Sequence, residues 1–251
     1  MDIESIYHSY LVGIEDARDY YKIKNVFHAS GAGSCYRKQL YSYFDYPRDS
    51  KDSRSYRLLR LGTIVHKEIE DALNHYEVAS DREYDVFTED EIKLNDLNVI
   101  GTYDVGQLKK HVRGTYSVEF TLWDIKTAAA YKWSKKFGRT PDKSSDINYK
   151  LQLGTYALGV YEKYKEVDKI NMFILWYNKN TSQMREQLIS PEWIDKATEY
   201  WVNLNQWLED TGEKYFEEEL MPDIIEGVPF QSWECKYCQY YSICPSELAN
   251  K

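Results

Sequence analysis

The sequence predicts an α/β (α+β) fold in which a central mixed sheet is flanked by helices. Its composition indicates an ordered chain with a substantial core, because 43% of the 251 residues are hydrophobic and 16% are aromatic. Strand-like runs follow one amphipathic segment and precede another helical segment, an element order typical of a sheet packed against helices. No internal repeat divides the chain, so we expect a single domain over residues 1–251.

The expected elements begin with an amphipathic helix over 56–74, where apolar residues recur at spacings of three and four: Leu58, Leu61, Val65, Ile69 and Leu73. Strand-like runs follow at 82–94, 98–108 and 116–126. The polar stretch 109–114 predicts a hairpin turn between the last two. The remaining elements are a helix at 146–164, a buried strand at 171–177 and a helix at 191–208, which Pro191 can open without cost.

The net charge of −9 argues at first against a nucleic-acid partner, since affinity for phosphates rests on Lys and Arg. Residues 209–226 contain eight acidic residues and one lysine, however, so this segment alone supplies −7 of that charge. The rest of the chain is therefore close to neutral. A solvated surface connection is the simplest interpretation of the acidic segment.

Basic and aromatic side chains alternate within residues 131–143. This pattern suits a single-stranded nucleic-acid track, where bases stack on rings and phosphates are neutralised. A solvated helix face explains the pattern equally well. The candidate DNA-binding residues are Lys132, Trp133, Lys135, Lys136 and Arg139.

The first ten residues, MDIESIYHSY, lack a basic stretch followed by an apolar run, and no segment offers ~18 uninterrupted apolar residues. We therefore expect a cytoplasmic protein without a membrane span. In a reducing compartment, four cysteines are more often metal ligands than disulfides.

All four cysteines fall into a pattern that suits a metal centre. Cys235, Cys238 and Cys244 are separated by two and then five residues, and Cys35 lies near the other end of the chain. A centre bound by all four would join the two ends. Unrelated buried thiols and a zinc site are the alternatives. Zinc sites usually pair one CxxC with a second CxxC or with histidines, so this spacing favours a [4Fe–4S] cluster.

Asp124 and Lys126 fall on one face of a predicted strand, because side chains alternate along a strand. Asp104 ends the neighbouring strand, so Asp104 and Asp124 are expected to converge across an antiparallel pair. Adjacent carboxylates repel unless a cation lies between them, and oxygen ligands favour Mg²⁺ or Mn²⁺. A surface strand with a salt bridge is the simpler alternative. Glu119 lies an odd interval from Asp124 and should point to the opposite face.

Three other polar residues occupy helical positions that allow them to join this group. His66 lies on the apolar face of the first helix, and Gln152 and Tyr156 are four residues apart on one side of a later helix. An ordinary packing role is the alternative for each.

Taken in order, these residues form a series that resembles the RecB-like branch of the PD-(D/E)XK nucleases. The motifs are Gly62-x3-His66, Gly101-x2-Asp104, Asp124-Ile125-Lys126 and Gln152-x3-Tyr156, framed by Cys35 and Cys235-x2-Cys238-x5-Cys244. Within that branch the chain looks like the iron–sulfur exonucleases of the CRISPR-associated RecB-like type and the AddB nuclease domain. The resemblance spans nearly the whole chain, from the first cysteine to the last.

The resemblance implies a restriction-endonuclease-like core over about 56–190, with helical and cluster-binding segments at about 28–55 and 191–251. Mg²⁺ or Mn²⁺ would be held by His66, Asp104, Asp124 and the carbonyl of Ile125. Lys126 would orient or help deprotonate the attacking water and stabilise charge on the phosphate, while Gln152 and Tyr156 would steady the site and contact the substrate. A structural [4Fe–4S] cluster would be bound by Cys35, Cys235, Cys238 and Cys244.

The expected function is that of a metal-dependent exonuclease that prefers single-stranded DNA ends. Recombination and repair, phage DNA processing and CRISPR adaptation use such chemistry, and partner proteins from these systems or self-association are compatible with the resemblance. The alternative from another class is a non-catalytic nucleic-acid-binding module. In that case a four-cysteine zinc or iron–sulfur site joins the ends, and the acidic residues are incidental.

Overall fold

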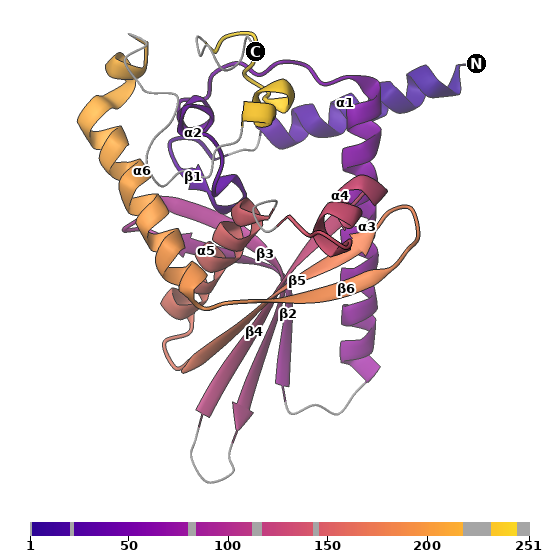
Figure 1. Ribbon diagram of the computed structural model, residues 1–251, viewed down its shortest axis with the longest axis vertical. Coiled ribbons are helices and arrows are strands. Elements are labelled where there is room, and N and C mark those ends of the chain that lie inside the picture. Colours follow the sequence, from indigo (N-terminus) through magenta and orange to yellow (C-terminus); the bar gives the residue numbers. More distant parts are fainter. Residues whose placement is uncertain are drawn as a thin grey trace.

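A six-stranded mixed sheet forms the centre of the molecule, with α5 and α6 on one side and α3 on the other, while Phe137 of α4 packs against Trp176 of β5 (Figure 1). In chain order the helices are α1 (Ile3–Tyr20), the 3-10 helix η1 (Ala29–Gly31), α2 (Tyr36–Tyr43), α3 (Ser53–Ala79), α4 (Ala130–Phe137), α5 (Ile147–Lys163), α6 (Glu192–Glu217) and the 3-10 helix η2 (Ser232–Tyr237). The strands are β1 (Phe27–His28), β2 (Tyr84–Leu94), β3 (Val99–His111), β4 (Ser117–Ala128), β5 (Lys169–Asn178) and β6 (Met184–Ile189).

The computed structural model describes residues 2–20, 23–79, 84–111, 117–142, 146–217 and 232–244. Residues 218–226 of the acidic segment lie outside this part of the chain. Over these ranges, no helix combines the length and apolar character needed to cross a bilayer.

The sheet opens between β3 and β4. These strands pair antiparallel from His111↔Ser117 as far as Val105↔Trp123, where the ladder stops. The short strand β1 then takes a parallel place beside β3 at Val99 and Ile100. On this edge of β3, residues 101–104 therefore lie between the part that pairs with β1 and the part that pairs with β4.

The core is built from alternating side chains of β4 and β5 covered by α5 and α6. Ile170, Met172, Ile174 and Trp176 of β5 are buried, as their period of two requires. Above them, the indole of Trp201 donates a hydrogen bond to Thr155 Oγ1 at 2.8 Å, which joins α6 to α5. The sheet and its two covering helices thus form one continuous hydrophobic cluster.

The structure confirms the α/β fold class and each element predicted from periodicity, with shifts at the ends. The first helix is longer than predicted, since α3 covers Ser53–Ala79, and β3 continues to His111 through the first part of the predicted turn. The predictions did not include α1, β1, α2, α4 and β6. The interpretation of the apolar stripe on α3 is partly wrong, because Leu58 and Leu61 are 45% and 43% exposed.

Candidate active site

The carboxylates of Asp104 and Asp124 meet where β3 and β4 diverge. They occupy the next register position after Val105↔Trp123, although the strands no longer pair there. Asp104 Oδ2 instead accepts a hydrogen bond from the Ile125 backbone N–H at 2.5 Å. The Asp104 side chain therefore accepts a hydrogen bond from a backbone N–H that has no partner in the ladder. This bond holds β3 and β4 together at the opening.

Asp124 is buried beside Lys126, as the shared strand face predicts. The Lys126 ammonium lies 2.8 Å from each oxygen of the Asp124 carboxylate. Burial raises the pKa of Asp124 to about 6, and the negative charge of Asp104 adds to this effect against the attraction of Lys126. Burial acts against the charge of Lys126, but Asp124 and Asp104 outweigh it and raise the lysine pKa. Lys126 is therefore held as a cation.

His66 reaches the same point from α3. Its Nδ1 lies 3.6 Å from Asp104 Oδ1. Burial opposes protonation of the imidazole, but the hydrogen bond and charge of Asp104 outweigh burial, and the His66 pKa is raised. One turn earlier, a Cβ on Gly62 would lie only 3.3 Å from Thr127 Oγ1. Glycine at this position allows α3 to approach the end of β4 closely, which brings His66 to the carboxylates.

Gln152 and Tyr156 approach from α5. Gln152 Nε2 donates a hydrogen bond to the Tyr156 hydroxyl at 2.7 Å, and both side chains are buried. Burial and the charge of Asp124 raise the pKa of Tyr156 well above its usual value. A Cβ on Gly101 would lie 2.6 Å from the Ala29 Cβ and 3.1 Å from Tyr156 Cε1. The glycine of this motif thus allows η1 and the tyrosine to pack on β3.

Two acidic residues that the sequence analysis missed lie beside this group. Glu89 of β2 occupies the register position opposite Asp104, between the pairs Thr88↔Val105 and Asp90↔Tyr103. Desolvation of its carboxyl, together with a hydrogen bond to buried Glu70, raises the pKa of Glu89 to about 7. The position of Glu89 could have been predicted from the sequence, because the tight connection between β2 and β3 fixes which residues of the two strands stand opposite each other.

Glu119 lies outside the site, as its odd interval from Asp124 predicts. Its carboxylate is 3.6 Å from the ammonium of Lys169, and it stands opposite Lys109 in the ladder.

No group of three or more His, Cys, Asp or Glu side chains is arranged to hold a metal ion within the described ranges. The donor chemistry at the strand opening nevertheless suits a hard divalent cation. Asp124 Oδ2 is buried and faces the ammonium of Lys126 at 2.8 Å, while the neighbouring carboxylate of Asp104 repels it. A divalent cation between the two carboxylates would offset this repulsion.

The four cysteines are free thiols, and three of them are close enough to interact. Cys35 precedes α2 as its N-cap, where burial raises its pKa to about 11 against the backbone N–H groups of Lys38 and Arg37, with a smaller contribution from the charges of Cys238 and Cys244. Cys235 is in the same turn as Cys238, whose backbone N–H donates to the Cys235 carbonyl at 3.0 Å. The described thiols do not form a closed metal-binding group.

The C-terminal segment 232–244 packs against α2 and the loop that follows it. Asp49 accepts a hydrogen bond from the Ser242 backbone N–H at 3.0 Å, and the Asp49 N–H donates to the Gln239 carbonyl at 2.6 Å. Tyr240 is fully buried against Tyr41. Protein contacts therefore place the segment 232–244 beside α2, in the part of the molecule where Figure 1 shows η2 next to α2.

The predicted DNA-binding segment separates into inward and outward residues. Lys136 pairs with fully buried Asp146, and Lys132 donates to the Tyr149 hydroxyl, so neither forms a simple exposed track. Trp133 packs partly against the core. Lys135 and Arg139 remain exposed, and Lys135 lies 5.6 Å from the centre of the exposed Tyr131 ring.

Comparison with known proteins identifies a family match over most of the chain. Residues 45–245 match the PD-(D/E)XK nuclease superfamily. No curated protein matches the sequence. Among solved structures, SSO0001 is similar over 98% of both chains, with 18% identity and a TM-score of 0.53, which supports the fold.

Two similar structures carry exonuclease descriptions. A candidate exonuclease from Eubacterium rectale is 15% identical, with a TM-score of 0.48, over 80% of this chain and 85% of its own. An alkaline exonuclease from Laribacter hongkongensis is 12% identical, with a TM-score of 0.43, over 78% of this chain and 93% of its own.

Proposed function

Because the chain belongs to the PD-(D/E)XK nuclease superfamily, we propose that it is a Mg²⁺- or Mn²⁺-dependent DNA exonuclease of the RecB-like branch that acts on single-stranded ends. The observation that carries the proposal is the convergence of His66, Asp104, Asp124 and Lys126 at the opening between β3 and β4. Recombination and repair, phage DNA processing or CRISPR adaptation would supply such DNA ends.

In this proposal His66, Asp104 and Asp124 hold the divalent cation, and the Ile125 carbonyl is a further candidate ligand. When bound, such a cation acts as a Lewis acid and lowers the pKa of a coordinated water. The repulsion between the Asp104 and Asp124 carboxylates supports this assignment, since a divalent cation between them would offset it.

Lys126 supplies fixed positive charge in this site. Because its pKa is raised, the ammonium stays protonated and can donate hydrogen bonds to the phosphate as negative charge develops there. Hydrolysis forms a bond from the water oxygen to phosphorus, breaks the bond to the leaving sugar oxygen and transfers a proton to that oxygen. Gln152 and Tyr156, joined by their hydrogen bond, keep α5 in place behind the carboxylates.

We also propose that Cys35, Cys235, Cys238 and Cys244 bind a structural [4Fe–4S] cluster. The mutual electrostatic effect of Cys35, Cys238 and Cys244 supports a shared centre. Anaerobically purified protein should then be brown and contain iron and labile sulfide. A colourless protein with stoichiometric zinc would contradict the cluster.

Digestion of labelled single-stranded DNA with Mn²⁺ or Mg²⁺ tests the nuclease. Lys126→Ala should lower the cleavage rate by about 10²- to 10³-fold, because a charge aimed at the transition state is lost. Lys169→Ala is the matched control, since Lys169 is an exposed lysine on the neighbouring strand. Circular dichroism would verify that both variants are folded.

Equal rates for wild type and folded Lys126→Ala would contradict the enzyme. DNA binding without metal-dependent cleavage would instead favour the non-catalytic binding module.

A further inference from the structure

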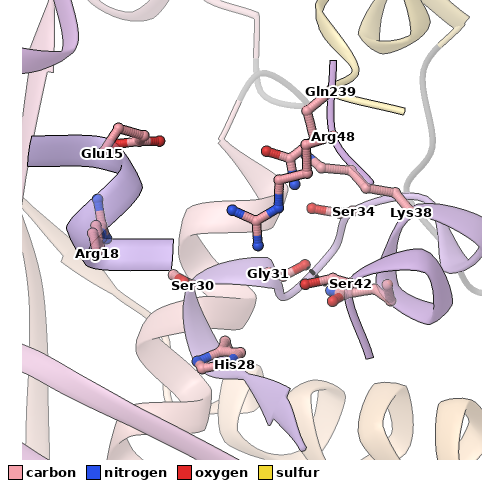
Figure 2. Close-up of a pocket in the computed structure, with 11 residues that line it drawn as sticks. Glu15, Arg18, His28, Ser30, Gly31, Ser34, Lys38, Ser42, Arg48 and Gln239 are labelled. Atoms are coloured by element: carbon pink, nitrogen blue, oxygen red, sulfur yellow. Dashed lines mark hydrogen bonds between the residues drawn. The ribbon is translucent and has the colours of Figure 1, made fainter. Parts of the chain in front are cut away.

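A polar cavity of about 330 Å³ lies between α1, η1 and α2, and none of the proposed catalytic residues lines it. Arg18 comes from α1, Lys38 from α2, and Arg48 from the loop after α2. Figure 2 shows the guanidinium of Arg48 extending into the space between α1 and η1. Three separate segments of the chain thus direct cationic side chains toward one space.

The cavity has an excess of hydrogen-bond donors and positive charge. Its lining includes the hydroxyl side chains of Ser30 and Ser34 and the imidazole ring of His28, and none of the lining residues has an aliphatic side chain. Glu15 is the acidic residue of the lining, and it forms an ion pair with Lys51. The charge of Glu15 also acts on Arg18 and Arg48, but three basic residues against one acidic residue leave the lining with net positive charge.

This combination matches a phosphate group better than other ligands. Arginine, lysine and serine donors bind phosphate oxygens through charge-assisted hydrogen bonds. An apolar ligand would need aliphatic side chains in the lining, which are absent from it. The His28 ring could stack on a base, but three cationic side chains favour an anionic phosphate over a neutral base. The side chain of Arg48 is fixed in place, since its Nε donates to the Tyr240 hydroxyl at 3.3 Å.

The floor of the cavity connects directly to the strand that carries Asp104. His28, Ser30 and Gly31 line the cavity, and His28 pairs with Ile100 of β3. Asp104 lies four residues further along the same strand, which corresponds to roughly 14 Å. A DNA strand bound at the active site could therefore reach the cavity within a few nucleotides.

We infer that this cavity binds a phosphate of the DNA strand whose end is cut at Asp104 and Asp124. The inference rests on the proposed nuclease function and adds a second, non-catalytic contact for the substrate. It assigns Arg18, Lys38 and Arg48 as phosphate-binding residues.

Binding of labelled single-stranded DNA in EDTA tests the inference without cleavage. Arg18→Gln combined with Lys38→Gln should weaken binding by roughly ten-fold, because charge-assisted hydrogen bonds to one phosphate are lost. The slope of log K against log salt should become shallower by about 0.7. Lys165→Gln combined with Lys169→Gln is the control, because it removes the same charge from exposed lysines outside the cavity lining.

Arg18→Gln alone should weaken DNA binding to an intermediate degree. This variant leaves Lys38, whose charge acts on Cys238, untouched, so its effect cannot come from the cysteines. A melting experiment with added inorganic phosphate at constant ionic strength distinguishes the source of the anion. Phosphate should raise the melting temperature of the wild type and not of the double variant.

Unchanged DNA affinity and salt slope in the double variant would overturn the inference, whether or not inorganic phosphate stabilises the wild type. If the wild type still cleaves DNA with Mn²⁺ in that case, only the cavity assignment fails. A wild type that neither binds nor cleaves DNA would overturn the proposed function as well.

Discussion

The strand opening and the cysteine region build their sites in different ways. Asp104 and Asp124 belong to strands whose shared ladder fixes their register, and a hydrogen bond from the Ile125 N–H joins them. Cys35 and Cys238 come from opposite ends of the chain, and the segments that carry them meet through a few contacts around Asp49 and Tyr240. The sheet therefore imposes the geometry of the first site, whereas a bound group would contribute much of the geometry of the second.

The largest expected effect tests whether the opening is a metal site. Asp104→Asn should lower metal-dependent DNA cleavage by about 10³-fold, because a charged ligand is lost. The asparagine oxygen can still accept the Ile125 N–H, so the melting temperature should change little. Glu119→Gln, on the same sheet and paired with Lys169, serves as control and should keep wild-type activity. An active Asp104→Asn variant would rule out the carboxylate pair as the metal site.

The second prediction tests how strongly the helices are fixed to the sheet. Fully buried Asp146 pairs with Lys136 of α4 and Lys150 of α5 and accepts a hydrogen bond from Gln187 of β6 at 2.9 Å. Asp146→Asn should lower the free energy of unfolding in urea at pH 7 by about 3 kcal/mol, because two lysines lose a buried partner. Asp71→Asn, an exposed partner of Lys67, should be nearly neutral.

Acid should remove the same stabilisation. Burial alone would raise the Asp146 pKa, but Lys136, Gln187 and Lys150 outweigh it and lower the pKa from 3.8. The stabilisation is therefore complete above the unfolded-state value and is lost as pH falls through the lower folded-state value. Wild type and Asp146→Asn should differ less in stability at pH 3 than at pH 7. A constant difference would contradict the ion-pair assignment.

The third prediction concerns the cysteine region alone. If the proposed cluster is bound, Cys35→Ser should lose iron and labile sulfide, and backbone amides of 232–244 should exchange hydrogen faster, because the segment would lose that cluster. Amides of β3 and β4 should keep their protection, since no cysteine lies in the sheet. Equal loss of protection in both regions would show that the cysteines support the whole fold.

The smallest expected effect concerns the aromatic ring of Tyr149, which lies beside the ammonium of Lys126. Its ammonium lies 5.0 Å from the centre of the Tyr149 ring, and Lys132 lies 4.2 Å from the same ring. Tyr149→Ala should lower the cleavage rate by about five-fold, because a partly desolvated cation–π contact is lost. Tyr149→Phe keeps the ring and should remain close to wild type. A similar loss in both variants would point to the hydroxyl instead.

Much of the sheet and of the candidate site could be predicted from the sequence, because strand periodicity and register are local properties. The proximity of Asp124 to Lys126 follows from a period of two, and the meeting of Asp104 and Asp124 follows from one antiparallel pair. The position of Glu89 opposite Asp104 was predictable in the same way, by counting residues back from the connection between β2 and β3.

Other features depend on contacts between distant segments. Lys136 was predicted to contact DNA because the local sequence does not show its ion pair with Asp146, which lies ten residues later at the start of α5. The exposure of Leu58 and Leu61 could not be predicted from periodicity either. The pattern identifies an apolar stripe on the helix, but it does not show whether another element covers that stripe. The cavity of Arg18, Lys38 and Arg48 combines three segments that carry no common motif.

The hydrogen bond from the Ile125 N–H gives the Asp104 carboxylate a structural role in addition to its proposed role as a metal ligand. Its single methylene sets how far β4 stands from β3 at the point where backbone pairing ends. A glutamate would lengthen the link by about 1.5 Å and widen the opening, although its charge and donor atoms would be the same. The length of the Asp104 side chain therefore matters as well as its charge, because it sets the width of the gap between β3 and β4 at the candidate site.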